Sequence, residues 1–296
     1  MGLAVGDALG TTLEFKAPGT FEPIEDMVGG GPFHLKAGQW TDDTSMAMCL
    51  AESLVARRGF DPADQMDRYR QWFRAGYWSC LDRCFDIGNA VRNAVVEFEK
   101  TGEPFCGSED PQTAGNGSIM RLVPVPLYYA GNPKEAIRLA AENSRTTHAA
   151  RTCLDACRLF ASLMIAATEV DEKDALMERA LSHLQESGED SLCPEMQSIA
   201  EGSYLTKEPP EIKGTGYVVD SLEAALWAFF KGNDFREGAL LAVNLGDDAD
   251  TTGAVFGQLA GIFYQYDGIP VEWREKIAWK KQIERLAEKV FRASLQ

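Results

Sequence analysis

Two short acidic segments, far apart in the chain, have residue types that bind metal ions. The first is Thr41-Asp42-Asp43-Thr44, and the second is Asp247-Asp248-Ala249-Asp250-Thr251-Thr252. We name them the first and second acidic clusters. Each leads directly into an apolar segment with helical periodicity. Carboxylates one or two residues apart do not share a face of a continuous helix, but they can converge in a loop or a first helical turn.

Helix capping is the simpler interpretation of one such cluster, because Asp and Thr bind free amides at helix N-termini. Two similar clusters favour a shared site. If they meet, two unit charges about 4 Å apart repel by roughly 4 kcal/mol at an effective dielectric constant of about 20. Mg²⁺ or Mn²⁺ would offset this repulsion, because both prefer carboxylate and hydroxyl oxygens. The sequence thus predicts two such ions, with these candidate ligands: Asp42, Asp43, Asp248, Asp250 and the neutral Thr41 and Thr251.

Three other acids stand out outside the two clusters. Asp7 and Glu14 interrupt an apolar N-terminal stretch, where Asp7 could support the metal ligands and Glu14 could be a pocket acid. A helix end or a solvated face explains both equally well. Asp86 precedes an expected helix, where a capping role alone would explain it.

A glycine-rich turn and two aromatic side chains complete the candidates. The Gly115-Asn116-Gly117-Ser118 turn can present backbone amides to a phosphate, although it matches neither the P-loop nor the dinucleotide-binding pattern. His148 is one of three histidines, and a lone histidine is more often structural than catalytic. Tyr217 lies between glycines and an expected helix, where it suits ring stacking or packing.

The elements that must position these residues are helices, since period-two alternation is almost absent. Asp61, Asn132 and Asp234 are expected helix caps. We find neither a clear linker nor a fixed-period repeat, so we expect one all-α domain over residues 1–296. The segments with apolar residues at three-to-four spacing are 45–58, 63–75, 88–100, 133–143, 149–167, 171–186, 221–231, 234–244, 252–266 and 277–294.

Composition limits the function classes. The 296 residues include 29 basic and 45 acidic side chains, for a net charge of −16, which disfavours nucleic acid or an anionic membrane as the main partner. The N-terminus lacks the pattern of a signal peptide, and no apolar run reaches the roughly 20 residues that span a bilayer. Seven cysteines without paired spacing indicate reduced thiols, so we expect a cytoplasmic protein.

In this order the segments resemble the ADP-ribosylglycohydrolases, closest to the dinitrogenase reductase-activating glycohydrolase branch. The resemblance runs from GLAVGDALGTTLEF through TDDTSM, DIGNAVR, AGNGSIMR and THAA to GTGYVVDSLEAAL and GDDADTTGAVFGQLAG. It implies a single-domain orthogonal helical bundle with a cleft for two Mg²⁺ or Mn²⁺ ions.

The resemblance also implies roles for individual residues. Asp86 is expected to act near the scissile bond, and Glu14 to gate the metals. Asp247 is left out of the ligands because the family often has glycine there. The implied metal ligands are Thr41, Asp42, Asp43, Asp248, Asp250 and Thr251, and the implied ADP-ribose contacts are Asn116, Gly117, Ser118, His148 and Tyr217.

The expected activity is hydrolysis of the bond at ribose C1″ that joins ADP-ribose to a protein arginine. Serine-linked, nucleic-acid-linked or small-molecule ADP-ribose conjugates are alternative substrates. Another alternative is an immunity protein or ADP-ribose binder that acts partly by occluding an ADP-ribosyltransferase, and a third is a helical domain with fortuitous caps. The expected partners are an ADP-ribosylated protein and the ADP-ribose product, with no membrane and no nucleic acid, and we expect a monomer.

Overall fold

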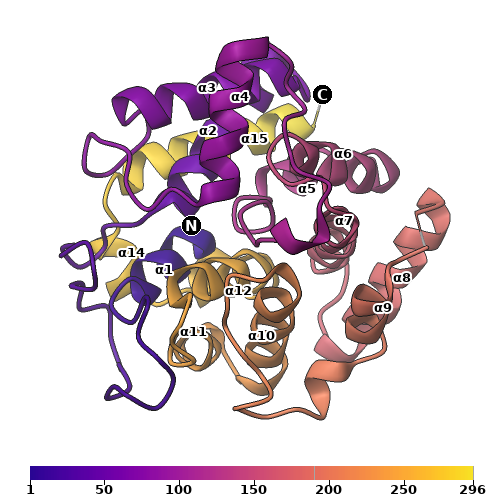
Figure 1. The fold of residues 1–296 in the computed structure, drawn as a ribbon. Coiled ribbons are helices and arrows are strands. Elements are labelled where there is room, and N and C mark those ends of the chain that lie inside the picture. Colours follow the sequence, from indigo (N-terminus) through magenta and orange to yellow (C-terminus); the bar gives the residue numbers. More distant parts are fainter. Residues whose placement is uncertain (190, 296) are drawn as a thin grey trace.

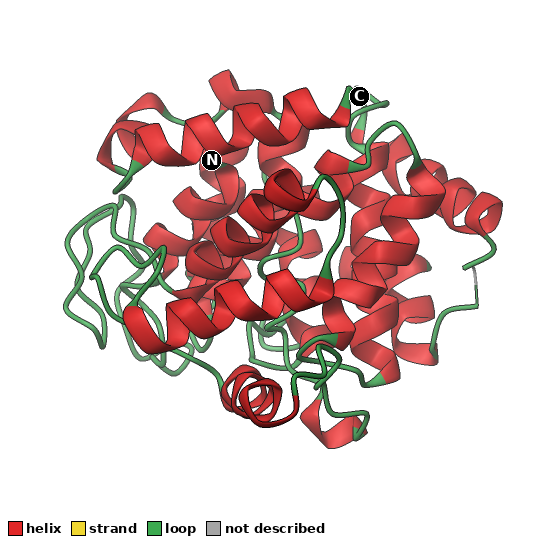
Figure 2. Cartoon of the chain, turned by 90° about the horizontal axis from the view of Figure 1, so that it is seen from above, coloured by secondary structure: helices red, strands yellow, loops and turns green. Residues whose placement is uncertain are grey.

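The computed structural model describes residues 1–189 and 191–295. Almost all of its regular structure is helical, and the helices cross one another at steep angles around a shared core (Figures 1 and 2). Pairing of β type within these residues is limited to isolated bridges, such as that between Gly115 and Tyr217. The all-α prediction is confirmed.

The helices are joined by connections of very different length, of which the longest, residues 11–41, separates α1 from α2. The α-helices are α1 (Gly2–Gly10), α2 (Asp42–Arg57), α3 (Pro62–Ala75), α4 (Asn89–Thr101), α5 (Pro124–Tyr128), α6 (Pro133–Arg145), α7 (Arg151–Ala166), α8 (Leu176–Ser187), α9 (Pro194–Ala200), α10 (Val218–Lys231), α11 (Phe235–Val243), α12 (Ala249–Phe263), α13 (Gln265–Gly268), α14 (Val271–Lys276) and α15 (Lys280–Ser294). Three single turns of 3₁₀-helix add to them: η1 (Pro111–Thr113), η2 (Lys173–Ala175) and η3 (Ser203–Leu205).

The periodic segments form helices close to the expected bounds, with two differences. Residues 171–186 form the turn η2 followed by α8, and residues 252–266 divide between α12 and α13. The expected caps are confirmed: Asp61, Asn132 and Asp234 each accept a hydrogen bond from an amide in the first turn of the next helix. Local chemistry therefore determines these helix starts.

Helix α1 was not predicted, because all nine of its residues are buried and it has no polar face. It packs directly on α12 (Figure 1), and glycines make this approach possible. A Cβ atom added at Gly6 would lie 1.9 Å from the carbonyl oxygen of Gly253, and one at Gly2 would lie 2.1 Å from that of Gly257. The two backbones touch and run in opposite directions, so the end of α1 at Gly10 lies beside the start of α12, where the second acidic cluster is.

Two observations concern membrane-spanning helices and the state of the cysteines. None of the helices in the described residues is both long and apolar enough to cross a bilayer. All seven cysteines lie in the described part of the chain, and all are free thiols. The single-domain boundaries stay a prediction.

Candidate metal centre and substrate cleft

The structure brings the two acidic clusters together. The Thr41 hydroxyl lies 3.1 Å from Asp43 Oδ2 and 3.2 Å from Asp250 Oδ2, although Thr41 and Asp250 are 209 positions apart. Thr251 Oγ1 lies 3.4 Å from Asp43 Oδ2. The start of α2 and the start of α12 therefore face each other.

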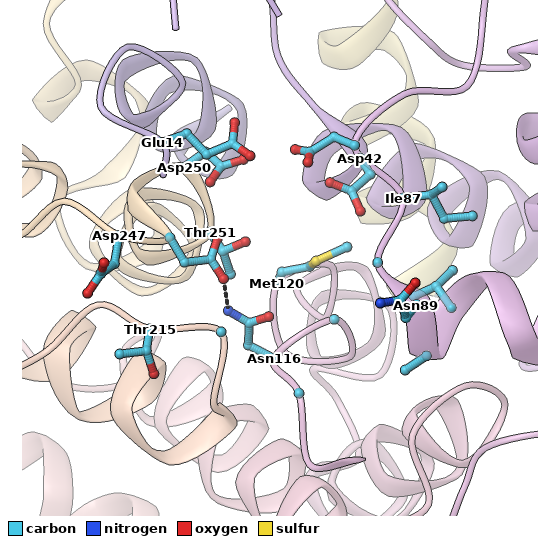
Figure 3. Close-up of a pocket in the computed structure, with 18 of the residues that line it drawn as sticks. Glu14, Asp42, Ile87, Asn89, Asn116, Met120, Thr215, Asp247, Asp250 and Thr251 are labelled. Carbon is cyan, nitrogen blue, oxygen red and sulfur yellow. Dashed lines mark hydrogen bonds between the residues drawn. The ribbon is translucent and has the colours of Figure 1, made fainter. Parts of the chain in front are cut away.

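Neither cluster caps its own helix, so the capping interpretation of these residues is wrong. Thr41 is the N-cap of α2 and Asp248 is the N-cap of α12, yet neither side chain accepts a capping hydrogen bond. The Asp248 carboxylate instead accepts a hydrogen bond of 2.7 Å from Asn116 Nδ2 (Figure 3). The side-chain oxygens of Thr41 and Asp248 therefore face the space between α2 and α12.

The carboxylates form two overlapping sets. Asp7, Asp43 and Asp250 each offer an oxygen within 4.8 Å of the other two, and Glu14, Asp86 and Asp250 do the same. Asp250 belongs to both sets. Figure 3 shows Asp42 facing Glu14 and Asp250 across the centre.

The hydrogen bonds in this centre leave negative charge uncompensated. The single hydroxyl proton of Thr41 faces carboxylate oxygens of Asp7, Asp43 and Asp250 at 3.0 to 3.2 Å, and it can be donated to only one of them. Asp43 Oδ1, Asp250 Oδ1 and Glu14 Oε2 are buried, and none of them has a hydrogen-bond partner among the described residues. Buried carboxylate oxygens without partners are costly, and an oxygen-only donor set is what Mg²⁺ or Mn²⁺ requires. The residues fit divalent metal ions.

The proton affinities agree with this interpretation. Burial raises the pKa of Asp42, Asp43 and Asp250 well above the usual range, and neighbouring carboxylates raise each pKa further. Burial and then the charge of Asp86 raise the pKa of Glu14, while burial is also the main cause of the raised pKa of Asp86. Positive charge in the centre would oppose all of these shifts.

A cleft of about 770 Å³ opens over the acidic centre. Its acidic wall includes Glu14, Asp42, Asp86, Asp248, Asp250 and Thr251. Its opposite wall has two glycine-rich loops and one imidazole, and includes Gly115, Asn116, Gly117, His148, Thr215 and Gly216, while residues 87–91 at the start of α4 also line the cleft. One side of the cleft is thus strongly anionic, while the other exposes backbone.

The two glycine-rich loops of the opposite wall are joined by backbone hydrogen bonds. The Asn116 amide donates to the Gly216 carbonyl at 3.0 Å, and the Val218 amide donates to the Ala114 carbonyl at the same distance. Arg121 holds the first loop from behind: it is fully buried and donates to the Gly117 carbonyl at 2.6 Å. Arg121 was not among the predicted site residues, although an arginine inside the apolar segment SIMRLVPV was a signal.

The other residues predicted to contact the substrate lie at different places relative to the cleft. His148 lines the cleft beside Gly117, where a Cβ would be 2.8 Å from His148 Cε1. Tyr217 is 39 % exposed and lies next to the lining residue Gly216. Ser118 is fully buried, and its hydroxyl accepts a hydrogen bond from the Cys157 thiol of α7, so this side chain lies behind the loop.

Comparison with known proteins identifies the family. The model of the ADP-ribosylglycohydrolase family matches residues 1–296. The chain belongs to this family. The resemblance deduced from the sequence is confirmed, and so is the fold. The family is metal-dependent, and the two acidic clusters form the candidate metal site of this member.

Several relatives are similar over nearly the whole chain. The ADP-ribosylarginine hydrolase Tri1 of Pseudomonas putida is 44 % identical over 98 % of this chain and 76 % of its own length. The ADP-ribosyl-[dinitrogen reductase] glycohydrolase of Rhodospirillum rubrum is 31 % identical over 96 % of this chain and 90 % of its own. A solved structure described as an ADP-ribosylglycohydrolase-related protein complex superposes with a TM-score of 0.86 and 45 % identity, covering 99 % of this chain and 95 % of that one.

The environment of His148 in this family member gives a first testable prediction. Burial, and secondly the charge of Arg121, lower the pKa of His148 to about 3. We therefore expect NMR signals of its ring to show no titration midpoint between about pH 5 and pH 8, the range in which histidine normally titrates. Because the unfolded chain binds this proton more tightly than the folded protein does, the contribution of His148 to the free energy of unfolding is at its full value above pH 6.5. It decreases as the pH falls from 6.5 towards 3. His148→Gln assigns the signal, and a midpoint near neutrality would contradict the prediction.

Proposed function

We propose that the protein is a metal-dependent hydrolase that removes ADP-ribose from modified arginine side chains of proteins. The observation that carries this proposal is the meeting of the two acidic clusters at one wall of a cleft. The names of the relatives from Pseudomonas putida and Rhodospirillum rubrum support ADP-ribosyl conjugates as the substrates, and the first of them supports the arginine linkage. The seven free thiols support action in the cytoplasm. We further infer a monomer with one domain over residues 1–296.

The acidic clusters would hold two Mg²⁺ or Mn²⁺ ions, through Thr41, Asp42, Asp43, Asp248, Asp250 and Thr251. When bound, such ions supply an orienting template for the ribose hydroxyls and Lewis-acid polarisation. The unpartnered oxygens of Asp43 and Asp250 support both residues as ligands. Glu14 Oε2 is likewise buried and unpartnered beside Asp86 and Asp250, which supports a role for Glu14 as a gating ligand at the edge of the centre.

The protein residues then account for the proton movements of the reaction. Water adds through its oxygen to C1″, the bond from C1″ to the guanidine nitrogen breaks, and a proton from water passes to that nitrogen. We assign this transfer to the Asp86 carboxyl, which lines the cleft beside Glu14 and Asp250. The carboxylates around it stabilise the positive charge that develops at C1″.

The opposite wall would bind the rest of ADP-ribose. Gly115 and Gly117 carry no side chains, so the diphosphate and ribose can approach the backbone of this turn. Asn116 links this turn to the acidic wall through its hydrogen bond to Asp248. His148 and Tyr217 are then positioned to flank the ADP-ribose, His148 from within the cleft and Tyr217 from its edge.

The direct test offers arginine-, serine- and DNA-linked ADP-ribose to the protein with Mg²⁺, Mn²⁺ or EDTA, and measures released ADP-ribose. We expect release from the arginine conjugate, dependent on metal and abolished by EDTA. Release only from serine or DNA conjugates would overturn the arginine assignment. Capture of an ADP-ribosyltransferase that survives EDTA, without any hydrolysis, would favour the occluding binder instead.

A further inference from the structure

The N-terminus of α2 is capped by a residue of another helix. Asp7, in α1, accepts the Thr41 amide on Oδ1 at 2.9 Å and the Thr44 amide on Oδ2 at 3.1 Å. These are the N-cap and N3 amides of α2, the two that a capping box normally satisfies from within the same helix. Asp7 accepts hydrogen bonds from both amides from its position in α1. The side chains of the first acidic cluster are therefore not needed to cap their own helix.

The hydrogen bonding of Asp7 differs from that of its acidic neighbours. Besides the two amides, it accepts the Thr44 hydroxyl at 2.6 Å, and its Oδ1 lies 3.0 Å from the Thr41 hydroxyl. Both of its oxygens are thus occupied by donors. Asp43 and Asp250, in contrast, each keep one buried oxygen without a partner. This contrast separates a carboxylate that orients a helix from carboxylates that are free to bind an ion.

Helix α1 also has a fixed position relative to the second acidic cluster. Next to Asp7, Gly6 touches the backbone of α12, and a Cβ added at Gly10 would lie 2.2 Å from the Ala249 carbonyl oxygen. Close-packed backbones resist sliding, because any shift brings atoms into overlap. The hydrogen bonds of Asp7 to α2 therefore connect the first cluster to a helix that is already held against the second.

We propose that Asp7 is a positioning residue that caps α2 from α1 and so sets the spacing between the two acidic clusters. It leaves Thr41, Asp42 and Asp43 facing the centre and fixes the start of α2 at the distance from Asp250 that a pair of divalent ions requires. The inference rests on the metal-binding part of the proposed function and is independent of which ADP-ribose linkage is cleaved.

The test measures Mn²⁺ binding by isothermal titration calorimetry in the absence of substrate. Asp7→Asn keeps the shape of the side chain but turns an amide NH₂ towards donors of Thr41 or Thr44. We expect its affinity for Mn²⁺ to fall about 10- to 100-fold, the usual loss when a residue that orients metal ligands is changed. Thr44→Val removes only the 2.6 Å hydrogen bond, and we expect a smaller loss in the same direction.

Asp234→Ala is the matched control. Asp234 caps α11 by accepting the Glu237 amide at 2.8 Å, and it does not line the cleft. We expect this variant and Asp7→Asn both to melt at a lower temperature than the wild-type protein in EDTA, but Asp234→Ala to bind Mn²⁺ with the wild-type affinity. A cap that is merely structural would behave in the same way at Asp7.

Wild-type affinity in a folded Asp7→Asn protein would overturn the inference. If circular dichroism shows that Asp7→Asn does not fold, wild-type affinity in Thr44→Val overturns it. Failure of the wild-type protein itself to bind Mn²⁺ would contradict both the inference and the proposed function, whereas wild-type affinity in the variants contradicts the inference alone.

Discussion

Asp250→Asn is expected to bind Mn²⁺ more than about 100-fold more weakly than the wild-type protein and to lose on the order of 10³-fold in turnover of ADP-ribosyl-arginine. In the described part of the chain, Asp250 is the one acid in both carboxylate sets, and its Oδ1 is buried without a hydrogen-bond partner. An asparagine retains the shape but removes a charge that two ions would share. Calorimetry of Mn²⁺ binding and a steady-state assay at saturating Mn²⁺ measure the two effects.

The same substitution should change stability in opposite directions with and without metal. In EDTA, removing one of several repelling buried carboxylates is expected to raise the melting temperature. In Mn²⁺ the wild-type protein should gain more, because an ion that binds only the folded state adds RT ln(1 + [L]/Kd) to its stability. Differential scanning fluorimetry in both conditions checks this crossover.

Asp247→Asn is the matched control for Asp250→Asn, since it removes an acid from the same segment. The Asp247 side chain points away from Glu14 and Asp250 (Figure 3), and Asp247 belongs to neither carboxylate set. Asparagine also tolerates the positive φ of 52° found there. We expect Mn²⁺ affinity close to wild type. An equal loss in both variants would mean that overall acidity, and not the ligand position of Asp250, governs metal binding.

Amphipathic periodicity was enough to predict the helices that have one polar face. Helix α6, for example, begins at Pro133 after the cap Asn132, as expected. Helix α1 was not predicted because its nine residues are all buried and show no amphipathic periodicity. The short helices α5 and α9 escaped because one or two turns cannot show periodicity, although each begins with a proline, a residue suited to the first position of a helix.

The sequence could also predict which residues form the site, but not which residues hold them in position. The residue types alone predicted that the two acidic clusters would repel each other if they met. In the structure they do meet, because Asp43 and Asp250 both lie within hydrogen-bond distance of the Thr41 hydroxyl. The capping of α2 by Asp7 depends on α1 contacting both α2 and α12, which no local pattern reveals. The hold of Arg121 on the Gly117 loop likewise depends on tertiary packing.

The second large effect is expected at Asp86. Its main chain has a φ of 61°, which is uncommon outside glycine, and it stands two residues before Gly88, the N-cap of α4. Capping therefore does not explain Asp86, whereas its place beside Glu14 and Asp250 in the cleft suits proton transfer. Strained backbone at a cleft residue is typical of functional sites. We expect Asp86→Asn to lower kcat by about 10²- to 10⁴-fold, the usual contribution of a general acid or base.

Asp82→Asn is the control that separates chemistry from backbone effects. Asp82 also has a positive φ, of 54°, on the same loop, but it is exposed and does not line the cleft. Asparagine adopts this conformation at both positions, so both variants should fold like the wild-type protein. Asp86→Asn should lose turnover while it retains most of its Mn²⁺ affinity, and Asp82→Asn should retain both. Near-normal kcat in Asp86→Asn would assign the proton transfer to another group, and Glu14, the neighbouring acid, would be the next to test.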